Sequence, residues 1–295
     1  MRFGGRRTSG NVENRRGASG GGFGFPMGGG GGLPLGGGKL GCGAIVVALI
    51  GALVFGIDPA QMLGTMEQMQ GSTQSAPAQG GTSAEESCAV NAYSQESCAA
   101  LASLNGTWEP LFQQAGIAFH QPKLVFYSQL GQSGCGAAQS AMGPFYCPED
   151  QGIYIDTAFY DQMERELGAG GDFARYYVIA HEYGHHIQQV TGVADQIRSA
   201  QQQNPRAANQ LQVLMELQAD CYAGVWAGKN RNAIEPGDFE EGMTAASAIG
   251  DDALTGGRVS TENFTHGTSA QRMQALRLGL ETGDDTQCDR ILQAR

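Results

Sequence analysis

The sequence is poor in basic residues. Its 295 residues include 18 lysines and arginines against 29 aspartates and glutamates, which gives a net charge of −11. The basic residues also gather near the start, since residues 1–57 hold six of them and a single acidic residue, Glu13. The rest of the chain carries 12 basic and 28 acidic residues, a net charge of −16. This excess argues against nucleic acid and anionic membrane surfaces as partners of that part.

The seven cysteines include no CxxC pair, so a metal site built from cysteines is not favoured. Cys42 lies in an apolar stretch, and the other six form an even number, which suggests three disulfide bonds in an oxidising compartment. Several connectivities are possible. We favour two pairs of near neighbours and a third made of the remaining cysteines: Cys88–Cys98, Cys135–Cys147 and Cys221–Cys288.

Residues 40–57, LGCGAIVVALIGALVFGI, lack any charge and are just long enough to cross the hydrocarbon core of a bilayer. A cleaved signal peptide is disfavoured, because no small-x-small cleavage site precedes Asp58 and the preceding region is too long. A lipoprotein anchor is disfavoured as well, since Cys42 precedes the apolar run and Lys39 stands where a lipobox has leucine. The stretch therefore predicts one transmembrane helix.

The excess of arginine and lysine before residue 40 predicts a single-pass protein of the inner (cytoplasmic) membrane, with its N-terminus in the cytoplasm. Residues 1–39 contain sixteen glycines and predict a disordered, basic tail. An RNA-binding arm is the alternative, but the arginines are few and form no RGG repeats. Residues 58–84, rich in Gln, Gly, Ser, Ala and Thr, predict a flexible linker. The domain at residues 85–295 is then periplasmic or extracellular.

Residues 181–186 read HEYGHH, inside a stretch whose pattern predicts a helix. On a helix, His181 and His185 are four residues apart and project from nearly the same face. Two neutral imidazoles placed in this way suit Zn²⁺, and Glu182, about 100° round the helix, can reach a water on the metal. The stretch therefore predicts a zinc site with Glu182 as general base. His186 points elsewhere and is expected either to pack or to support the ligands without binding the metal.

A second acidic motif, ELQAD, runs from Glu216 to Asp220 on a later predicted helix. A zinc site with two histidines needs a third protein ligand, and glutamate is an established choice, which favours Glu216. Asp220, one turn on, is placed to accept the outer N–H of a zinc-bound histidine. Each motif alone also fits a plain helix, with clustered histidines or a solvated acidic face. The two together favour zinc.

The remaining pattern of residues 85–295 predicts an α+β domain, mostly helical with a small β-sheet or hairpin. A strand is expected at Lys123–Ser128, and Phe145–Cys147 with Ile153–Asp156 suggests a hairpin. We expect Ile153–Asp156 to be the sheet edge that pairs with substrate, although a purely structural hairpin is an equal alternative. Helices are expected at residues 86–104, 158–167, 172–190, 206–227, 238–249 and 268–279.

Local signals set several of the expected helix ends. Asp172 follows two glycines and is the expected N-cap of the helix that carries HEYGHH, while Gly192 is its expected stop. Thr268 and Gln271 have the spacing of a capping box for the last helix. These signals place the histidine motif well inside a helix.

Four strings, GPFYCPEDQGIYIDTAFY, GDFARYYVIAHEYGHH, ELQADCYAGVWAG and FTHGTSAQR, resemble the bacterial neutral zinc metallopeptidases, a family of single-span membrane proteins. The resemblance covers roughly residues 122–288, and HExxH followed by ExxxD is the pattern of the gluzincin branch of zinc peptidases. It implies a zincin-like fold, zinc ligands at His181, His185 and Glu216, and Glu182 as general base.

Amide hydrolysis places negative charge on the former carbonyl oxygen, and zinc peptidases usually add a side-chain donor for it. The string THGxxxxR at residues 265–272 is similar to THPxxxxR of the membrane-bound CAAX-processing gluzincins. This similarity implies an oxyanion role for His266 and a position near the metal for Arg272, with the local backbone left open by the glycine. The alternative is a helix-entry histidine and a surface arginine. His120 is expected to be a surface or packing residue.

The sequence as a whole predicts a membrane-anchored, extracytoplasmic zinc peptidase that hydrolyses peptide or protein substrates with metal-activated water. A non-catalytic binding or scaffold protein on a peptidase fold is one alternative, and the intact Glu182 argues against it. A zinc amidase that acts on cell-wall peptides is the other, and only substrate profiling separates it from a peptidase.

Overall fold

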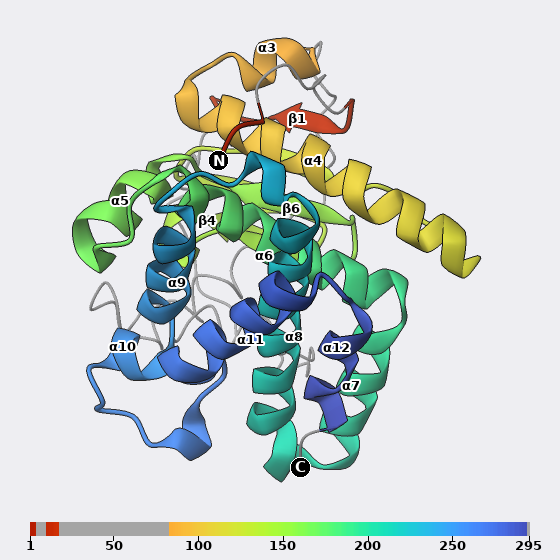
Figure 1. The fold of residues 1–295 in the computed structure, drawn as a ribbon. Helices are drawn as coiled ribbons and strands as arrows, with labels where there is room; N and C mark the ends of the chain where they lie inside the picture. Colours follow the sequence, from red (N-terminus) through yellow and green to blue (C-terminus); the bar gives the residue numbers. More distant parts are fainter. Residues whose placement is uncertain (4–9, 18–82, 294–295) are drawn as a thin grey trace, which may run out of the picture.

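The computed structural model describes residues 1–3, 10–17 and 83–293. The predicted transmembrane helix at residues 40–57, together with most of the predicted tail and linker, lies outside the described residues. Among the helices that are described, none is long and apolar enough to cross a membrane. The described chain forms an α+β domain in which helices outweigh a small sheet (Figure 1).

The main sheet has four strands in the order β1-β2-β6-β5. Strands β1 (Val12–Asn14), β2 (Lys123–Phe126) and β6 (Gly152–Ile155) are parallel, and β5 (Phe145–Cys147) runs antiparallel to β6. All four residues of β6 are buried, as expected for an interior strand covered on both faces. The expectation that Ile153–Asp156 forms the sheet edge is therefore wrong. That edge is β5, because the turn after Cys147 folds it onto the outer side of β6.

A separate two-stranded sheet consists of β3 (Leu130–Ser133) and β4 (Gly136–Gln139). The disulfide Cys135–Cys147 ties the turn of this hairpin to the end of β5. Val125, Tyr127 and Tyr154 form a small apolar cluster beneath it. The hairpin therefore holds β5 from the side opposite the helices.

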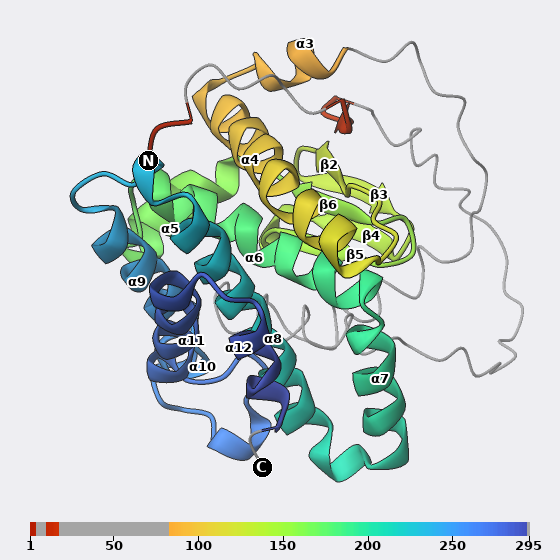
Figure 2. The same ribbon diagram turned by 45° about the vertical axis from the view of Figure 1, so that its right-hand side comes forward.

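The helices are α3 (Ala84–Cys88), α4 (Ala92–Ala115), α5 (Ala158–Leu167), α6 (Asp172–Val190), α7 (Val193–Gln203), α8 (Ala208–Lys229), α9 (Asp238–Ala248), α10 (Asp251–Thr255), α11 (Ser269–Thr282) and α12 (Thr286–Asp289). Helix α6 packs against α4, α8 and α9, and it is buried along most of its length. In Figure 2, α4 runs diagonally across the front of the sheet, while α8 and α11 lie on the other side of α6. The helix that carries HEYGHH is thus the centre of the fold.

Helices α8 and α11 approach closely because glycines face the contact. A Cβ atom on Gly224 of α8 would lie 2.1 Å from the carbonyl oxygen of Leu276, and one on Gly279 of α11 would lie 2.0 Å from that of Cys221. The disulfide Cys221–Cys288 then joins α8 to α12. These contacts fix the helix that carries Glu216 and Asp220.

Most of the expected elements are present. The ends of α5 and α6 fall where the sequence predicted them, and the capping box of Thr268 and Gln271 opens α11. The predicted helix at residues 86–104 is instead two helices, α3 and α4, separated by a turn at residues 89–91. Asp172 is the first residue of α6 rather than its N-cap, because Gly171, with φ of 101°, supplies the entry turn. All three predicted disulfides are present, Cys88–Cys98 included.

The start of the chain differs from the expected disordered tail. Residues 1–3 and 10–17 pack against the domain, and Met1, Phe3 and Val12 are buried there. The prediction of disorder rested on the many glycines of residues 1–39 and did not take these three apolar residues into account. The remainder of the predicted tail lies outside the described residues.

Candidate metal centre

The two histidines of the motif project from α6 toward α8. His181 and His185 lie one turn apart, and their rings meet edge to face with centroids 4.9 Å apart. The helix that holds them begins after Gly171 and ends before Gly192, which has φ of 77°. Its interior position keeps His181 buried, and the side chain of His185 is 17% exposed. One face of the pair is therefore open to a small ligand.

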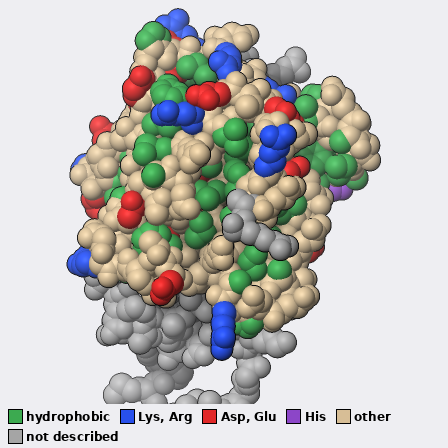
Figure 3. Space-filling view, turned by 60° about the horizontal axis from the view of Figure 1, so that its bottom comes forward, with side chains coloured by type: hydrophobic (Ala, Val, Ile, Leu, Met, Phe, Trp, Pro, Cys, Tyr) green, Lys and Arg blue, Asp and Glu red, His purple; other side chains and the backbone are tan. Residues whose placement is uncertain are grey.

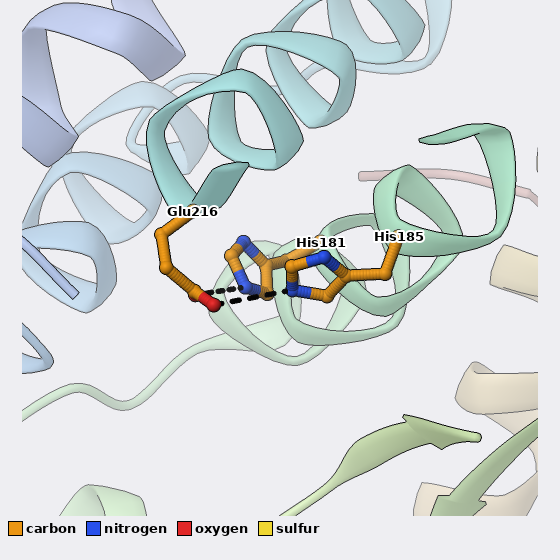
Figure 4. A group of neighbouring side chains, drawn as sticks. All are labelled: His181, His185 and Glu216. Carbon is orange, nitrogen blue, oxygen red and sulfur yellow. Dashed lines mark ion pairs between the residues drawn. The ribbon is translucent and has the colours of Figure 1, made fainter. Parts of the chain in front are cut away.

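Glu216 on α8 completes a group of three metal-ligating side chains, as Figure 4 shows. Its Oε2 lies 3.2 Å from Nε2 of His181, and its Oε1 lies 3.6 Å from Nε2 of His185. The three ligand atoms all lie within 4.8 Å of one another. Two imidazole nitrogens and one carboxylate oxygen are the donor set of a catalytic zinc site with an open fourth position. The residues present therefore fit Zn²⁺.

The outer nitrogen of each histidine is also held, which orients both rings. Nδ1 of His181 lies 2.8 Å from Oδ1 of Asp220, and Nδ1 of His185 lies 2.9 Å from Oε1 of Gln188. Gln188 in turn donates from Nε2 to the carbonyl oxygen of Met215. With Nδ1 engaged in this way, Nε2 of both rings is left to face Glu216 and a metal.

Asp220 is the centre of a buried polar network. It accepts two hydrogen bonds from the fully buried Arg272, from Nε at 2.8 Å and from Nη2 at 2.9 Å, and a third from the hydroxyl of Tyr177 at 2.6 Å. Although burial alone would raise it, Arg272 and His181 hold the pKa of Asp220 at about 2. Arg272 is thus buried at the site and is not a surface charge.

Glu182 lies next to the ligand group, close to His181, His185 and Glu216. Burial raises the pKa of its carboxyl group above the usual value for glutamate, and the neighbouring His181 and His185 counteract part of that rise. The backbone of Tyr146 also counteracts part of that rise, and α6 contacts β5. Strand β5 therefore lies close to the helix that carries the acid–base candidate.

His266 precedes α11 and faces the same site. Its Nδ1 lies 3.1 Å from Oδ1 of Asp251, whose other oxygen accepts the backbone N–H groups of Thr265, His266 and Gly267. Against the effect of burial, His185 and His181 hold the pKa of Glu216 well below its usual value, and His266 adds to this effect, which places His266 near the ligand group. Because Asp251 engages Nδ1, Nε2 is the ring atom available to a bound substrate.

The other two histidines lie apart from the ligand group. His186 is buried between aromatic rings, its Nδ1 lies 3.0 Å from the hydroxyl of Tyr146, and its Nε2 donates to the backbone carbonyl of His120 at 2.7 Å. Burial lowers the pKa of His186 to about 4, so the ring is neutral and packs. The side chain of His120 is exposed.

Three supporting residues were missed by the sequence reasoning. Tyr177 precedes His181 by four residues and Gln188 follows His185 by three, so helical spacing places both on the ligand face. Asp251 carries no such signal, because its role depends on the backbone turn at residues 265–267.

Known proteins resemble this chain along most of its length. The model of a protein family described as "Putative neutral zinc metallopeptidase" matches residues 1–291. The chain is 44% identical over 296 residues to "Uncharacterized protein YpfJ" of Escherichia coli (strain K12), covering 98% of each chain. It is 37% identical over 257 residues to "Uncharacterized protein Rv2575" of Mycobacterium tuberculosis (strain ATCC 25618 / H37Rv), covering 81% of this chain and 84% of that protein. No solved structure matches. The chain belongs to the neutral zinc metallopeptidase family, and zinc is the cofactor that this family implies.

Proposed function

We propose that this protein is a membrane-anchored, extracytoplasmic zinc peptidase in which Glu182 is the general base. One observation carries the proposal: the donor atoms of His181, His185 and Glu216 converge, and Glu182 lies beside them on the same helix. Histidines that only pack would not need a partner for Nδ1 of each ring together with the carboxylate of Glu216 facing both Nε2 atoms.

Bound zinc would polarise the scissile carbonyl and acidify a water molecule. Glu182 takes the proton from the attacking water and delivers it to the leaving amide nitrogen. Its raised pKa suits this role, since a base is most effective when its pKa lies near the working pH. Nε2 of His266 donates to the oxygen that gains negative charge, with Asp251 holding the ring in position.

The substrate is a peptide or protein segment that lies extended along the outer side of β5. Strand β5 is at one edge of the four-stranded sheet and pairs with β6 alone among the described strands. Helix α6 contacts β5, and the hydroxyl of Tyr146 lies 3.0 Å from Nδ1 of His186, so a chain paired with this edge passes close to the helix that carries the ligands. On the face drawn in Figure 3, lysines and arginines stand singly among acidic and apolar side chains, which is not the basic patch that nucleic acid requires.

Two observations support the compartment and the anchor. The three disulfides, each with Cα atoms 5.6–6.0 Å apart, have geometry that suits formation in an oxidising compartment. The apolar composition of residues 40–57, which lie outside the described residues, supports attachment to a membrane.

A peptide library tests the proposal. The full chain, purified without chelator, is incubated with a random peptide mixture beside Glu182→Gln and the exposed control Glu262→Gln. We expect cleavage by wild type and control, and a loss of about 10²–10⁴-fold in Glu182→Gln with zinc retained. Zinc-loaded wild type that cleaves no peptide would refute the peptidase, and hydrolysis of cell-wall peptides alone would identify an amidase.

A further inference from the structure

The N-terminal segment, defined here as residues 1–3 and 10–17, forms part of the domain's sheet. Strand β1 pairs in parallel with β2, with Val12, Glu13 and Asn14 opposite residues 124–126. The backbone N–H of Leu124 donates to the carbonyl of Asn11 at 2.9 Å, and that of Arg15 donates to the carbonyl of Phe126 at 2.7 Å. The segment thus supplies the strand that covers the outer edge of β2.

Side chains on both sides of β1 secure this pairing. Glu13 forms an ion pair with Lys123 at 3.2 Å, and Arg15 donates to the carbonyl of Gln132 at 2.8 Å. The guanidinium group of Arg16 lies 4.2 Å above the ring of Phe126 and donates to Ser94 at 2.7 Å. Such specific contacts on the sheet and on α4 distinguish a docked strand from a tail that merely touches the surface.

A second anchor lies at the start of α6. Phe3 is 5% exposed and packs between Tyr176 of α6 and Trp226 of α8, with ring centroids 5.2 and 5.5 Å away. The amino group of Met1 lies 2.8 Å from the carboxylate of Asp172. Two separate sites, the sheet edge and this aromatic slot, therefore bind the same segment.

We propose that the N-terminal segment and residues 83–293 lie on the same side of any membrane to which the chain is attached. A β-strand pair and an aromatic slot cannot form across a bilayer. This excludes the single crossing with a cytoplasmic N-terminus that the charge pattern predicts. The inference is independent of the peptidase chemistry.

The ion pair of Glu13 and Lys123 offers a direct test. A zero-length carbodiimide joins a carboxylate to an amine in contact, so treatment of the full chain in its native membrane should link these two side chains. The linked peptides are identified by mass. We expect the link to be lost in Glu13→Gln and kept in Glu85→Gln, which removes an exposed glutamate of α3. Absence of the link in wild type would overturn the proposal.

Sidedness is then measured with single reporter cysteines. Gly10→Cys and Val90→Cys place thiols at exposed positions in the N-terminal segment and in the domain, each in a Cys42→Ser background. Spheroplasts are treated with a membrane-impermeant maleimide before and after lysis, and labelled peptides are identified by mass. We expect either both thiols to be labelled before lysis or both to be labelled only after it. Labelling of one before lysis and the other only afterwards would overturn the proposal.

Discussion

Oδ1 of Asp220 on α8 lies 2.8 Å from Nδ1 of His181 on α6. Helix α8 therefore orients a histidine of the HEYGHH motif, although the motif itself lies on α6. Asp220 is fully buried and ionised, and it keeps that state because Arg272 is bonded to both of its oxygens. The ligand geometry at the metal centre therefore depends on a charge pair contributed by α8 and α11.

Replacement of Arg272 should destabilise the whole domain. Arg272→Met leaves Asp220 as a buried charge without its partner, which costs about 3–5 kcal/mol. At about 2–4 °C per kcal/mol for a domain of this size, we expect Tm to fall by roughly 6–20 °C. Arg277→Met, on the exposed side of the same helix, is the control. Equal Tm values for the two variants would show that the buried pair is not needed for stability.

Zinc content should follow the three ligands. His185→Ala removes one donor, so elemental analysis should find little zinc, whereas His120→Ala should bind as much as wild type. Chelation of wild type should lower Tm, because a ligand at about 100 times its Kd stabilises the folded state by about 2.7 kcal/mol. Full zinc content in His185→Ala would mean that the metal binds elsewhere.

His266 should affect turnover and not metal binding. We expect His266→Phe to lower kcat by about 10²–10³-fold, the usual effect of removing one oxyanion donor, with KM nearly unchanged. His120→Phe should behave like wild type. Near-normal turnover in a folded, zinc-loaded His266→Phe would assign this histidine to helix entry alone.

The contact between α8 and α11 should not tolerate a methyl group. Gly224→Ala directs its Cβ at the backbone oxygen of Leu276, which cannot move aside as a side chain could. Overpacking of this kind costs about 1–3 kcal/mol, visible as a lower denaturant midpoint. Gly10→Ala meets nothing within 4 Å and is the control. An unchanged midpoint for Gly224→Ala would mean that the two helices separate readily.

The aromatic slot predicts that the first residues stabilise the domain. Truncation of a buried phenylalanine costs about 3–5 kcal/mol, so Phe3→Ala should lower Tm markedly. Ile117→Ala, which shortens a side chain that is 42% exposed, should change Tm little. If Phe3→Ala melted like wild type, residues 1–3 would not be packed in solution.

Local signals in the sequence predicted most helices and the histidine motif. Glycines at residues 168, 171 and 192 mark helix ends, and the HExxH spacing needs only a single helix to bring two ligands together. Pairing between distant segments was not predictable in this way. The position of β6 inside the sheet depends on β2 and β5 flanking it, and no periodicity in residues 152–155 reports which neighbours they have.

The same limit applies to the site. The link from His181 to Asp220 could be expected from two helical spacings, one on each helix. The contact of Asp251 with His266 depends on a turn in which three successive N–H groups converge on one oxygen, and residue types alone do not specify that turn. Helix α7 was missed because its buried face is short and consists of Ala194, Ile197 and Gln201, of which only Ile197 is a large apolar residue.

The pairing of β1 with β2 has a consequence for the order in which the protein folds. Asn11 is made well before its partner Gln121, which follows 110 residues later. At about 5–20 residues per second, the ribosome needs roughly 6–20 s to supply the strand that β1 requires. Long-range parallel pairing is also slow to form, because the entropy of closing the loop is lost before the strand contacts can offset it. During synthesis, β1 therefore stays unpaired for longer than the other strands of this sheet.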